Sequence, residues 1–282
     1  MGDVSPPRGL ERFKDLEENV TETGASSPMC RLCGGEVRKQ FELMVLDRHQ
    51  VGYFVCIQCG SLQSEYPFWL PEAYEVNLSH LDVGAVQRCL SNACAVVAIS
   101  RLTRCKNIVD FGGGDGLLCR LLRDYGLNCF VDDKFATPTY AQSFTQPDFL
   151  RPDILVAFEV IEHFARPTTE LSALFDTKAE IVMVTTELYS QQHADWWYLT
   201  PSSGQHVFFY SRQALLRVAE RFSYDVAIFN KYVVFYRPNR IAPYVIALLK
   251  VLFARVPLRF ARAILLAGPS MGVARDFELL KR

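Results

Sequence analysis

The pattern of hydrophobic and polar positions predicts alternating strands and helices from about residue 83 onward. Apolar side chains recur at helical spacing between residues 83 and 104, which predicts a helix. The continuous apolar run 154–158 is typical of a strand that is buried on both faces of a parallel sheet. The predicted strands are 108–111, 128–133, 154–158, 181–184, 226–229 and 232–236, and the predicted helices are 83–104, 117–122, 166–175 and 211–221.

This alternation predicts an α/β fold with a Rossmann-like, mostly parallel sheet. Strands 226–229 and 232–236 are expected to form an antiparallel pair that closes the sheet. A doubly wound domain of this kind also requires a third strand between residues 140 and 150, where Phe144 is the only firm hydrophobe. The third strand is therefore expected in that region but is not located more closely.

A glycine-rich bend follows the first of these strands. Asp110 is followed by glycines at 112, 114 and 116, and a helical run begins directly after them. The glycines permit left-handed backbone angles and close approach of a ligand to the main chain, while the helix directs free N–H groups at the same place. A dinucleotide fingerprint would need a glycine where Leu117 stands, so that motif fails, and no phosphate-loop string follows.

The bend, acid-x-G-x-G-x-G, resembles motif I of class I S-adenosylmethionine (SAM) methyltransferases. The resemblance implies that Asp110, Gly112, Gly114 and Gly116 belong to a SAM site. It also implies that an acid at the end of the next strand binds the ribose hydroxyls, and Asp133 is expected in that role, with Asp132 as the alternative. A plain strand–turn–helix connection with a solvated acid is the competing interpretation.

A second motif of the same family follows the fourth expected strand. Residues 159–164 read Glu-Val-Ile-Glu-His-Phe, similar to the family's F-E-V-x-E-H, whose first acid lies near the methionine end of the cofactor. The resemblance assigns Glu159 to that position. Open parallel sheets bind ligands beyond the carboxyl ends of their strands, which is where Glu159 and Glu187 are expected. The start of a surface helix is an equally simple interpretation of Glu162 and His163.

Four cysteines upstream form two C-x-x-C-G knuckles, Cys30 with Cys33 and Cys56 with Cys59. Thiolates at this spacing can reach one tetrahedral ion, and two such pairs make a closed structural zinc site. Short strands are expected between the knuckles, as in a zinc ribbon. A redox pair and chance spacing are the weaker alternatives. The aromatic segment 61–81 that follows is expected to wrap the second domain or to roof a substrate pocket.

An aromatic segment beyond the fifth strand carries the candidate substrate contacts. Aromatic faces combined with a few polar groups suit sugars. The candidate contacts are Trp196, Trp197, Tyr198 and Gln205, and they lie close to His206 in the sequence.

Residues 203–211, together with the cysteine module, resemble sugar C-methyltransferases that act on nucleotide-linked deoxysugars. Those enzymes carry a Y-H-E-H-x-x-Y-F-S-like segment whose last histidine is implicated as a base, which makes His206 the expected general base, with His163 and Glu187 as alternatives. This chain has Gly204 and Gln205 where that family has histidine and glutamate. Whether carbon or oxygen accepts the methyl group is left open.

Charge and composition add a basic tail to this picture. The total net charge is −1, but residues 237–282 hold nine Lys and Arg against two acids, a net charge of +7 that leaves −8 for the rest. Because the total net charge is −1, the composition gives no argument for nucleic acid, which is not an expected partner. A peripheral membrane contact, a homo-oligomer contact or a solvated helix face would each explain the tail. Residues 241–266 are expected to form a helical pair around Pro257, with Arg255, Arg259 and Arg262 on one face.

The expected organisation is a flexible arm (1–28), a zinc module (29–65), a linker with the leading helix (66–104), the SAM-binding domain (105–237) and the basic tail (238–282). Without an apolar signal core near residue 1, a cytoplasmic location is expected, with membrane association through the tail as an alternative. The predicted function is SAM-dependent methyl transfer, by direct displacement, to a saccharide or nucleotide-linked sugar. The alternatives are another metabolite or a lipid-linked acceptor, or a non-catalytic interaction protein that retains the SAM fold and the zinc ribbon.

Overall fold

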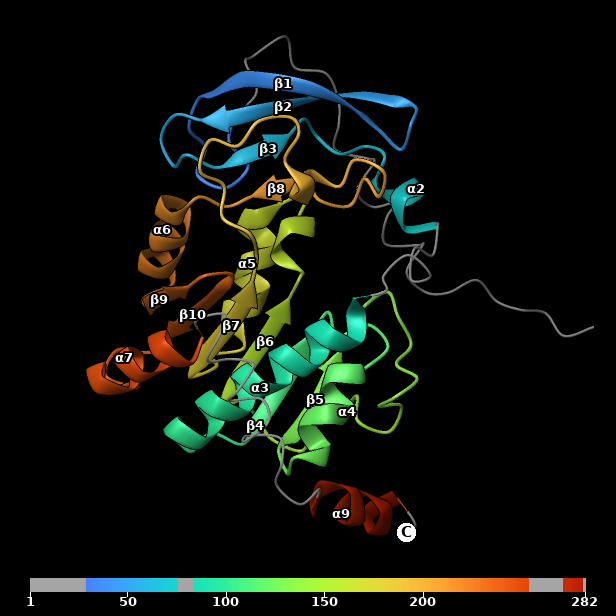
Figure 1. Ribbon diagram of the computed structural model, residues 1–282, viewed down its shortest axis with the longest axis vertical. Coiled ribbons are helices and arrows are strands. Elements are labelled where there is room, and N and C mark those ends of the chain that lie inside the picture. The colour runs from blue at the N-terminus through green and yellow to red at the C-terminus, as the bar shows by residue number, and fades with distance from the viewer. Residues whose placement is uncertain (1–28, 76–83, 254–270, 281–282) are drawn as a thin grey trace, which may run out of the picture.

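The structure, a computed structural model, describes residues 29–75, 84–253 and 271–280 of the chain. These residues form a six-stranded sheet with helices on both faces, and a four-stranded antiparallel sheet that lies over one end of it (Figure 1). The predicted arm 1–28 lies outside the described residues, and so does the second half of the helical pair that was expected around Pro257.

The large sheet has the strand order β5-β4-β6-β7-β10-β9. Its first four strands are parallel, and β10 pairs antiparallel with both β7 and β9. The α/β fold class and the antiparallel closing pair are therefore confirmed. The strands are β4 (Asn107–Phe111), β5 (Asn128–Asp132), β6 (Ile154–Phe158), β7 (Ile181–Thr185), β9 (Asp225–Phe229) and β10 (Tyr232–Tyr236).

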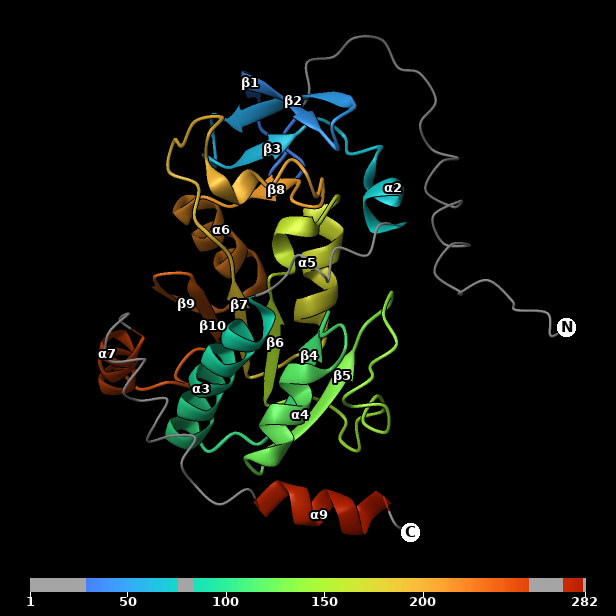
Figure 2. The ribbon, with the colours of Figure 1, turned by 45° about the vertical axis from the view of Figure 1, so that its right-hand side comes forward.

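Side chains that alternate along the strands divide the core into two layers. Ile154 and Val156 of β6 face one apolar cluster, while Leu155 and Ala157 face another. The first cluster is covered by α3, α4 and α7, and the second by α5 and α6; α3 and α4 lie in front of the sheet in Figure 2. The helices are α3 (Ala85–Thr103), α4 (Leu117–Asp124), α5 (Pro167–Asp176), α6 (Arg212–Phe222) and α7 (Pro243–Leu252).

The expected third strand between residues 140 and 150 does not form. This region is a loop of turns and bends, and β5 is the edge strand of the sheet. Phe144 is buried, and its carbonyl accepts one hydrogen bond from the N–H of Val131 at 2.8 Å. The apolar residues of this region are separated by polar residues and Pro147, so they do not make the continuous apolar run that a buried parallel strand needs. The prediction of a third strand was wrong, because it was taken from the fold class and not from the residues of this region.

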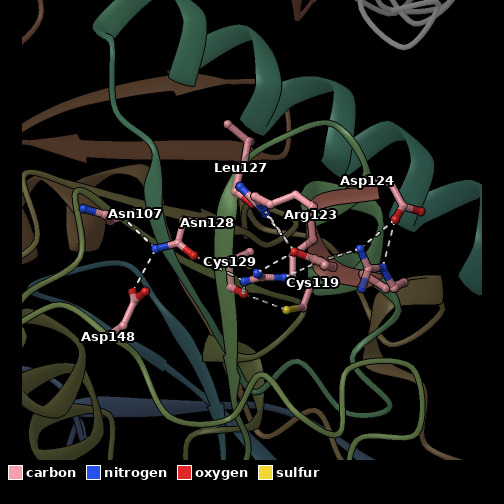
Figure 3. A network of polar contacts seen from close by, with 11 residues as sticks. Asn107, Cys119, Arg123, Asp124, Leu127, Asn128, Cys129 and Asp148 are labelled. Atoms are coloured by element: carbon pink, nitrogen blue, oxygen red, sulfur yellow. Dashed lines mark hydrogen bonds and ion pairs between the residues drawn. The ribbon is translucent and has the colours of Figure 1, made fainter. Parts of the chain in front are cut away.

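A C-terminal helix, α9 (Met271–Leu280), packs beside this edge through a buried ion pair. Arg123 of α4 is 2% exposed and donates from Nε and Nη2 to the two carboxylate oxygens of Asp276, at 2.8 and 2.9 Å. Arg120 donates to the same carboxylate at 2.8 Å. Figure 3 shows Arg123 also reaching the carbonyl of Cys129 on β5, at 2.7 Å. The charge of Asp276 therefore ties α9 to α4, and Arg123 in turn ties α4 to the edge strand.

The small sheet has the order β1-β2-β3-β8, and all of its pairings are antiparallel. β1 (Val37–Val45), β2 (His49–Cys56) and β3 (Leu62–Ser64) come from the predicted zinc module, whose expected short strands are confirmed. β8 (Phe208–Phe209) lies much later in the chain, between β7 and β9. It pairs with Leu62 and Gln63 of β3. A segment that lies between β7 and β9 in the chain therefore completes the small sheet.

No helix within the three described ranges is both long and apolar enough to span a bilayer.

Removing the Asp276 carboxylate should destabilise the fold. In Asp276→Ala, Arg123 would stay buried without its partner, which costs on the order of 3 kcal/mol of unfolding free energy. Urea denaturation followed by circular dichroism measures this. Glu278→Ala, which removes an exposed acid from the same helix, is the control and should leave the midpoint unchanged. Equal midpoints for the two variants would contradict the anchoring role of Asp276.

Candidate active site

The candidate site lies at the carboxyl ends of β4 to β7, beneath the small sheet. The glycine bend follows β4, Asp133 follows β5, residues 159–163 follow β6, and Thr186 and Glu187 follow β7. The short helix α2 (Leu70–Glu75) lies beside this edge (Figure 2). From α2, the ring of Tyr74 stacks on Phe135 with centroids 5.7 Å apart, and its hydroxyl lies 3.2 Å from Nδ1 of His163. Part of the segment 61–81 thus covers the edge.

The middle of the glycine bend is open. Gly114 has a φ of +53°, and a Cβ built there would meet no atom within 4 Å. The backbone angle favours glycine, and the space above it admits a ligand to the main chain. Gly116 is the residue from which α4 begins, so the first free N–H groups of that helix face the bend.

Asp133 lies at the rim of this open space. Its Oδ2 accepts a hydrogen bond from the N–H of Gly114 at 2.9 Å, and its Oδ1 accepts from the N–H groups of Phe135 and Ala136 at 2.8 Å each. Three backbone donors therefore fix a carboxylate against the bend. Asp132, the alternative, ends β5 with its side chain exposed, and only its carbonyl reaches the bend, through the N–H of Gly112 at 2.7 Å.

Asp110 supports the bend from below. It is 2% exposed, and a Cβ at Gly113 would lie only 2.6 Å from its Oδ2. Burial raises the pKa of this carboxyl to about 7. Because Asp110 lies beneath the backbone, it would contribute to cofactor binding indirectly, by supporting the conformation of the bend.

Glu159 begins the segment after β6 with a φ of +55°. The hydroxyl of Thr185 accepts from its N–H at 2.9 Å and donates to its Oε1 at 2.7 Å. Lys231 lies 3.9 Å from the same carboxylate. Glu159 is thus held at the sheet edge, between β6 and β7.

Three titratable residues meet under the small sheet. Glu162, His163 and His206 each place one ligand-type atom within 4.8 Å of the others, and the two imidazole rings stand edge to face with centroids 4.9 Å apart. Nδ1 of His206 lies 2.7 Å from the carbonyl oxygen of Tyr198. A carbonyl only accepts, so Nδ1 carries the hydrogen and Nε2 keeps a free lone pair. The structure therefore brings together His206 and His163, two of the predicted catalytic residues.

Glu162 is the member of this cluster that sequence reasoning did not select. Its side chain is fully buried, its Oε1 accepts from the hydroxyl of Tyr198 at 2.6 Å, and its Oε2 has no hydrogen-bond partner among the described residues. Burial, followed by the neighbouring charge of Glu159, raises the pKa of Glu162 to about 8. The motif at residues 159–164 could have pointed to Glu162, but nothing in the sequence showed that this residue would be buried.

The two histidines are held in their neutral form. Burial lowers the pKa of His163 to about 3, with a smaller contribution from His206, and burial also lowers the pKa of His206. A neutral imidazole has a lone pair to offer to a proton or a metal.

The other predicted catalytic and substrate residues lie around this cluster. Glu187 is half-buried at the end of β7, outside the three-residue group. Trp197 is 69% exposed, whereas Tyr198 is 1% exposed and has no ring face left for stacking on a sugar. Trp196 packs against Tyr198 and Phe209, with centroids 5.4 Å apart in both pairs. Of the three aromatic residues, Trp197 alone presents a large surface.

Gly204 and Gln205, the two residues that differ from the sugar C-methyltransferase pattern, hold the segment before His206 in place. Gln205 donates from its side chain to the carbonyl of Ala73 in α2 at 2.9 Å. Gly204 has a φ of +64°, and a Cβ there would lie 3.1 Å from Leu46, so a histidine at this position would be strained. Its carbonyl accepts from the indole of Trp69 at 2.8 Å. Gly204 and Gln205 thus connect the loop of His206 to the cysteine module and α2.

The four cysteines of the knuckles form one cluster. Their sulfur atoms lie within 4.8 Å of one another, with Cys30 to Cys59 at 3.7 Å and Cys33 to Cys56 at 3.5 Å. Four thiols at such spacing fit a single tetrahedral zinc ion, with no position left for a substrate.

The first knuckle also reaches the candidate site through Arg31. Its guanidinium donates to the carbonyl of Val207 at 2.5 Å and to that of Ala165 at 3.3 Å. The N–H of Val207 in turn donates to the carbonyl of Glu162 at 2.9 Å. Arg31 therefore stands directly behind the cluster of Glu162, His163 and His206.

An open sheet with a glycine bend and a fixed acid at its carboxyl edge is the arrangement of a Rossmann-like, cofactor-binding domain. Comparison with known families narrows this class: a family described as "Methyltransferase domain" matches residues 87–227, half of the chain. The chain belongs to this family and is a SAM-dependent methyltransferase. A search of curated protein sequences finds no match.

Several solved structures are similar to the chain. The methyltransferase domain of bacterial CtHen1 is 19% identical, with 52% of this chain and 97% of that chain covered and a TM-score of 0.39. Magnesium protoporphyrin IX methyltransferase from Synechocystis PCC 6803, with bound S-adenosylhomocysteine (SAH), is 13% identical (61% and 96% covered, TM-score 0.44). Human N-acetylserotonin methyltransferase in complex with SAM is 15% identical (52% and 51% covered, TM-score 0.40). The family assignment rests on the match over residues 87–227.

Arg31→Met should loosen the loop that carries His206. The change removes the charged donors to the carbonyls of Val207 and Ala165, so that Val207 keeps only its hydrogen bonds from Ser64. Loss of these charge-assisted hydrogen bonds should cost about 2 kcal/mol. Chemical denaturation should therefore show a lower midpoint. Arg38→Met removes an exposed arginine of β1 and serves as the matched control. A wild-type midpoint for Arg31→Met would show that this contact does not hold the two sheets together.

Proposed function

We propose that the protein transfers the methyl group of SAM to a small polar acceptor, namely a saccharide or nucleotide-linked sugar. The observation that supports this proposal is the juxtaposition, at one sheet edge, of the open glycine bend with Asp133 and of a neutral His206 with a free Nε2 lone pair. Because one edge carries both a cofactor-type cradle and a proton acceptor, the geometry favours an enzyme over a non-catalytic scaffold.

The chain offers a fitting site for SAM. The space above Gly114 would be filled by any side chain at that position, and Asp133 is fixed at its rim as an acceptor for vicinal ribose hydroxyls. Gly112, Gly116 and Glu159 border the same edge. SAM, when bound, supplies the electrophilic methyl group. The protein's part is to orient the acceptor towards that edge and to remove its proton.

His206 is the proposed general base. Its Nδ1–H is fixed by the carbonyl of Tyr198, so the unprotonated Nε2 is left to accept a proton, and His206 lies in one cluster with His163 and Glu162. His163, whose Nδ1 contacts the hydroxyl of Tyr74, and Glu187 at the end of β7 are the alternatives.

The proposal of a sugar acceptor rests on the resemblance of residues 203–211 and on Trp197, which offers an exposed ring beside Tyr198. Aromatic faces bind the C–H faces of sugars while polar groups meet their hydroxyls. Labelled-methyl screening of nucleotide-linked sugars, lipid-linked sugars and other small metabolites tests the acceptor class. Labelling confined to non-sugar metabolites would replace this part of the proposal.

The four cysteines are proposed to hold a structural zinc ion. The sulfur cluster and the two C-x-x-C-G spacings support this role. Because the first knuckle carries Arg31, the ion would also help to fix the backbone behind His206. A cytoplasmic location and a membrane or homo-oligomer contact of the tail remain predictions, and much of the tail lies outside the described residues.

Asp133→Ala should weaken cofactor binding. Loss of a charged acceptor for the ribose hydroxyls is expected to raise the dissociation constant of SAM and of SAH roughly tenfold or more. Isothermal titration calorimetry measures both constants. The neighbouring Asp132→Ala is the control and should stay close to wild type. The same affinity in Asp133→Ala as in wild type would remove Asp133 from the cofactor site.

His206→Ala should retain SAM binding and lose turnover. Removal of a general base is expected to lower kcat by about 10²- to 10⁴-fold, as measured by transfer of labelled methyl to the acceptor found by screening. His193→Ala changes an exposed histidine elsewhere in the same long loop and should remain active. Wild-type turnover in His206→Ala would shift the base to His163 or Glu187.

A further inference from the structure

The cluster of Glu162, His163 and His206 includes an unsatisfied carboxylate oxygen. Glu162 is fully buried, yet its Oε2 has no partner among the described residues. A buried polar atom without a partner is costly, on the order of 1–3 kcal/mol, and native structures rarely leave one unexplained. A group bound between this oxygen and the two histidines would remove the penalty.

Each member of the cluster is held by one atom and leaves another available. The carboxylate of Glu162 is held through Oε1 by the hydroxyl of Tyr198 at 2.6 Å, and His206 is held through Nδ1 by the carbonyl of the same tyrosine at 2.7 Å. His163 is held through Nδ1 by the hydroxyl of Tyr74 at 3.2 Å. Histidines that bind metals are typically oriented in this way, with the second ring nitrogen bonded to a carbonyl or another polar group.

We infer that Glu162, His163 and His206 form a binding site for one divalent transition-metal ion. One carboxylate and two neutral imidazoles are a ligand set for ions such as Zn²⁺ and Mn²⁺. Three protein ligands leave coordination positions open, as catalytic metal sites do, whereas the four-cysteine cluster is closed. Both histidines are partly exposed, so the cluster is not fully enclosed by the described residues.

This inference rests on the proposed function and changes one part of it. With the ion bound, the Nε2 lone pair of His206 is a ligand and no longer accepts the proton itself. A hydroxyl of the acceptor that coordinates to the ion would have a lowered pKa. Its O–H bond breaks and the proton passes to solvent water, while the oxygen keeps the electron pair that forms the new bond to the methyl carbon. The cofactor sulfur takes the electron pair of the bond that breaks.

Titration with Mn²⁺, followed by electron paramagnetic resonance, tests the site in the full-length, zinc-loaded protein. Mn²⁺ prefers oxygen and nitrogen ligands over thiolates, so it probes this cluster without displacing zinc from the cysteines, and metal analysis should show one zinc per chain throughout. The wild type should bind one Mn²⁺ per chain. Glu162→Gln should raise the dissociation constant at least tenfold, while Glu75→Gln, an exposed acid of α2, should match the wild type.

Two further measurements keep the test decisive. If Glu162→Gln fails to fold, as judged by circular dichroism, His206→Gln replaces it, because His206 is less deeply buried than Glu162. Wild-type protein that binds Mn²⁺ no better than the variant would overturn the metal site; a proton shared within the cluster would then account for the buried carboxylate.

Activity separates this inference from the proposed function. Turnover that is lost after treatment with a chelator that leaves the zinc in place, and that returns with Mn²⁺, supports the metal site. Turnover that survives the same treatment would overturn its catalytic role and leave His206 as the base. A protein that does not bind SAM would disprove the proposed function, whereas the Mn²⁺ titration would still decide whether the site exists.

Discussion

The architecture depends on one strand pairing, between β3 of the cysteine module and β8 of the methyltransferase domain. Two residue pairs, Leu62 with Phe209 and Gln63 with Phe208, make this pairing and bring β8 into the small sheet. Arg31 reinforces the junction through the carbonyl of Val207, and the hydroxyl of Ser211 donates to the carbonyl of Cys59 while it caps α6 by accepting from the N–H of Ala214. The cysteine module is therefore part of the wall of the active-site region.

This junction places a polar cluster in an apolar setting. Tyr198 lies among buried aromatic and aliphatic side chains, yet its hydroxyl donates to Glu162 and its carbonyl accepts from His206. One tyrosine thereby orients two members of the cluster. Burial keeps both histidines neutral, which gives the site lone pairs at neutral pH.

Much of the large sheet could be predicted because its strands carry strong local signals. The run 154–158 is apolar throughout, and β9 and β10 form the antiparallel pair that was expected. The region around Phe144 shows the limit of such reasoning, because the fold class demanded a strand that the residues could not form. At that edge Arg123 pairs with Asp276, which lies far away in the chain. No local sequence pattern indicates this ion pair.

The sequence by itself determined the glycine bend, the acid after β5, the cysteine spacing and the family motifs, since each is a local arrangement of residue types. Tertiary structure alone decided that Glu162 is buried with a free oxygen, that Tyr198 is part of the core and not a sugar-stacking surface, and that Arg31 stands behind His206. Burial and the direction of a side chain depend on what packs against it. In this protein the packing partner is a sheet built from segments about 145 residues apart, as the pairing of Gln63 with Phe208 shows.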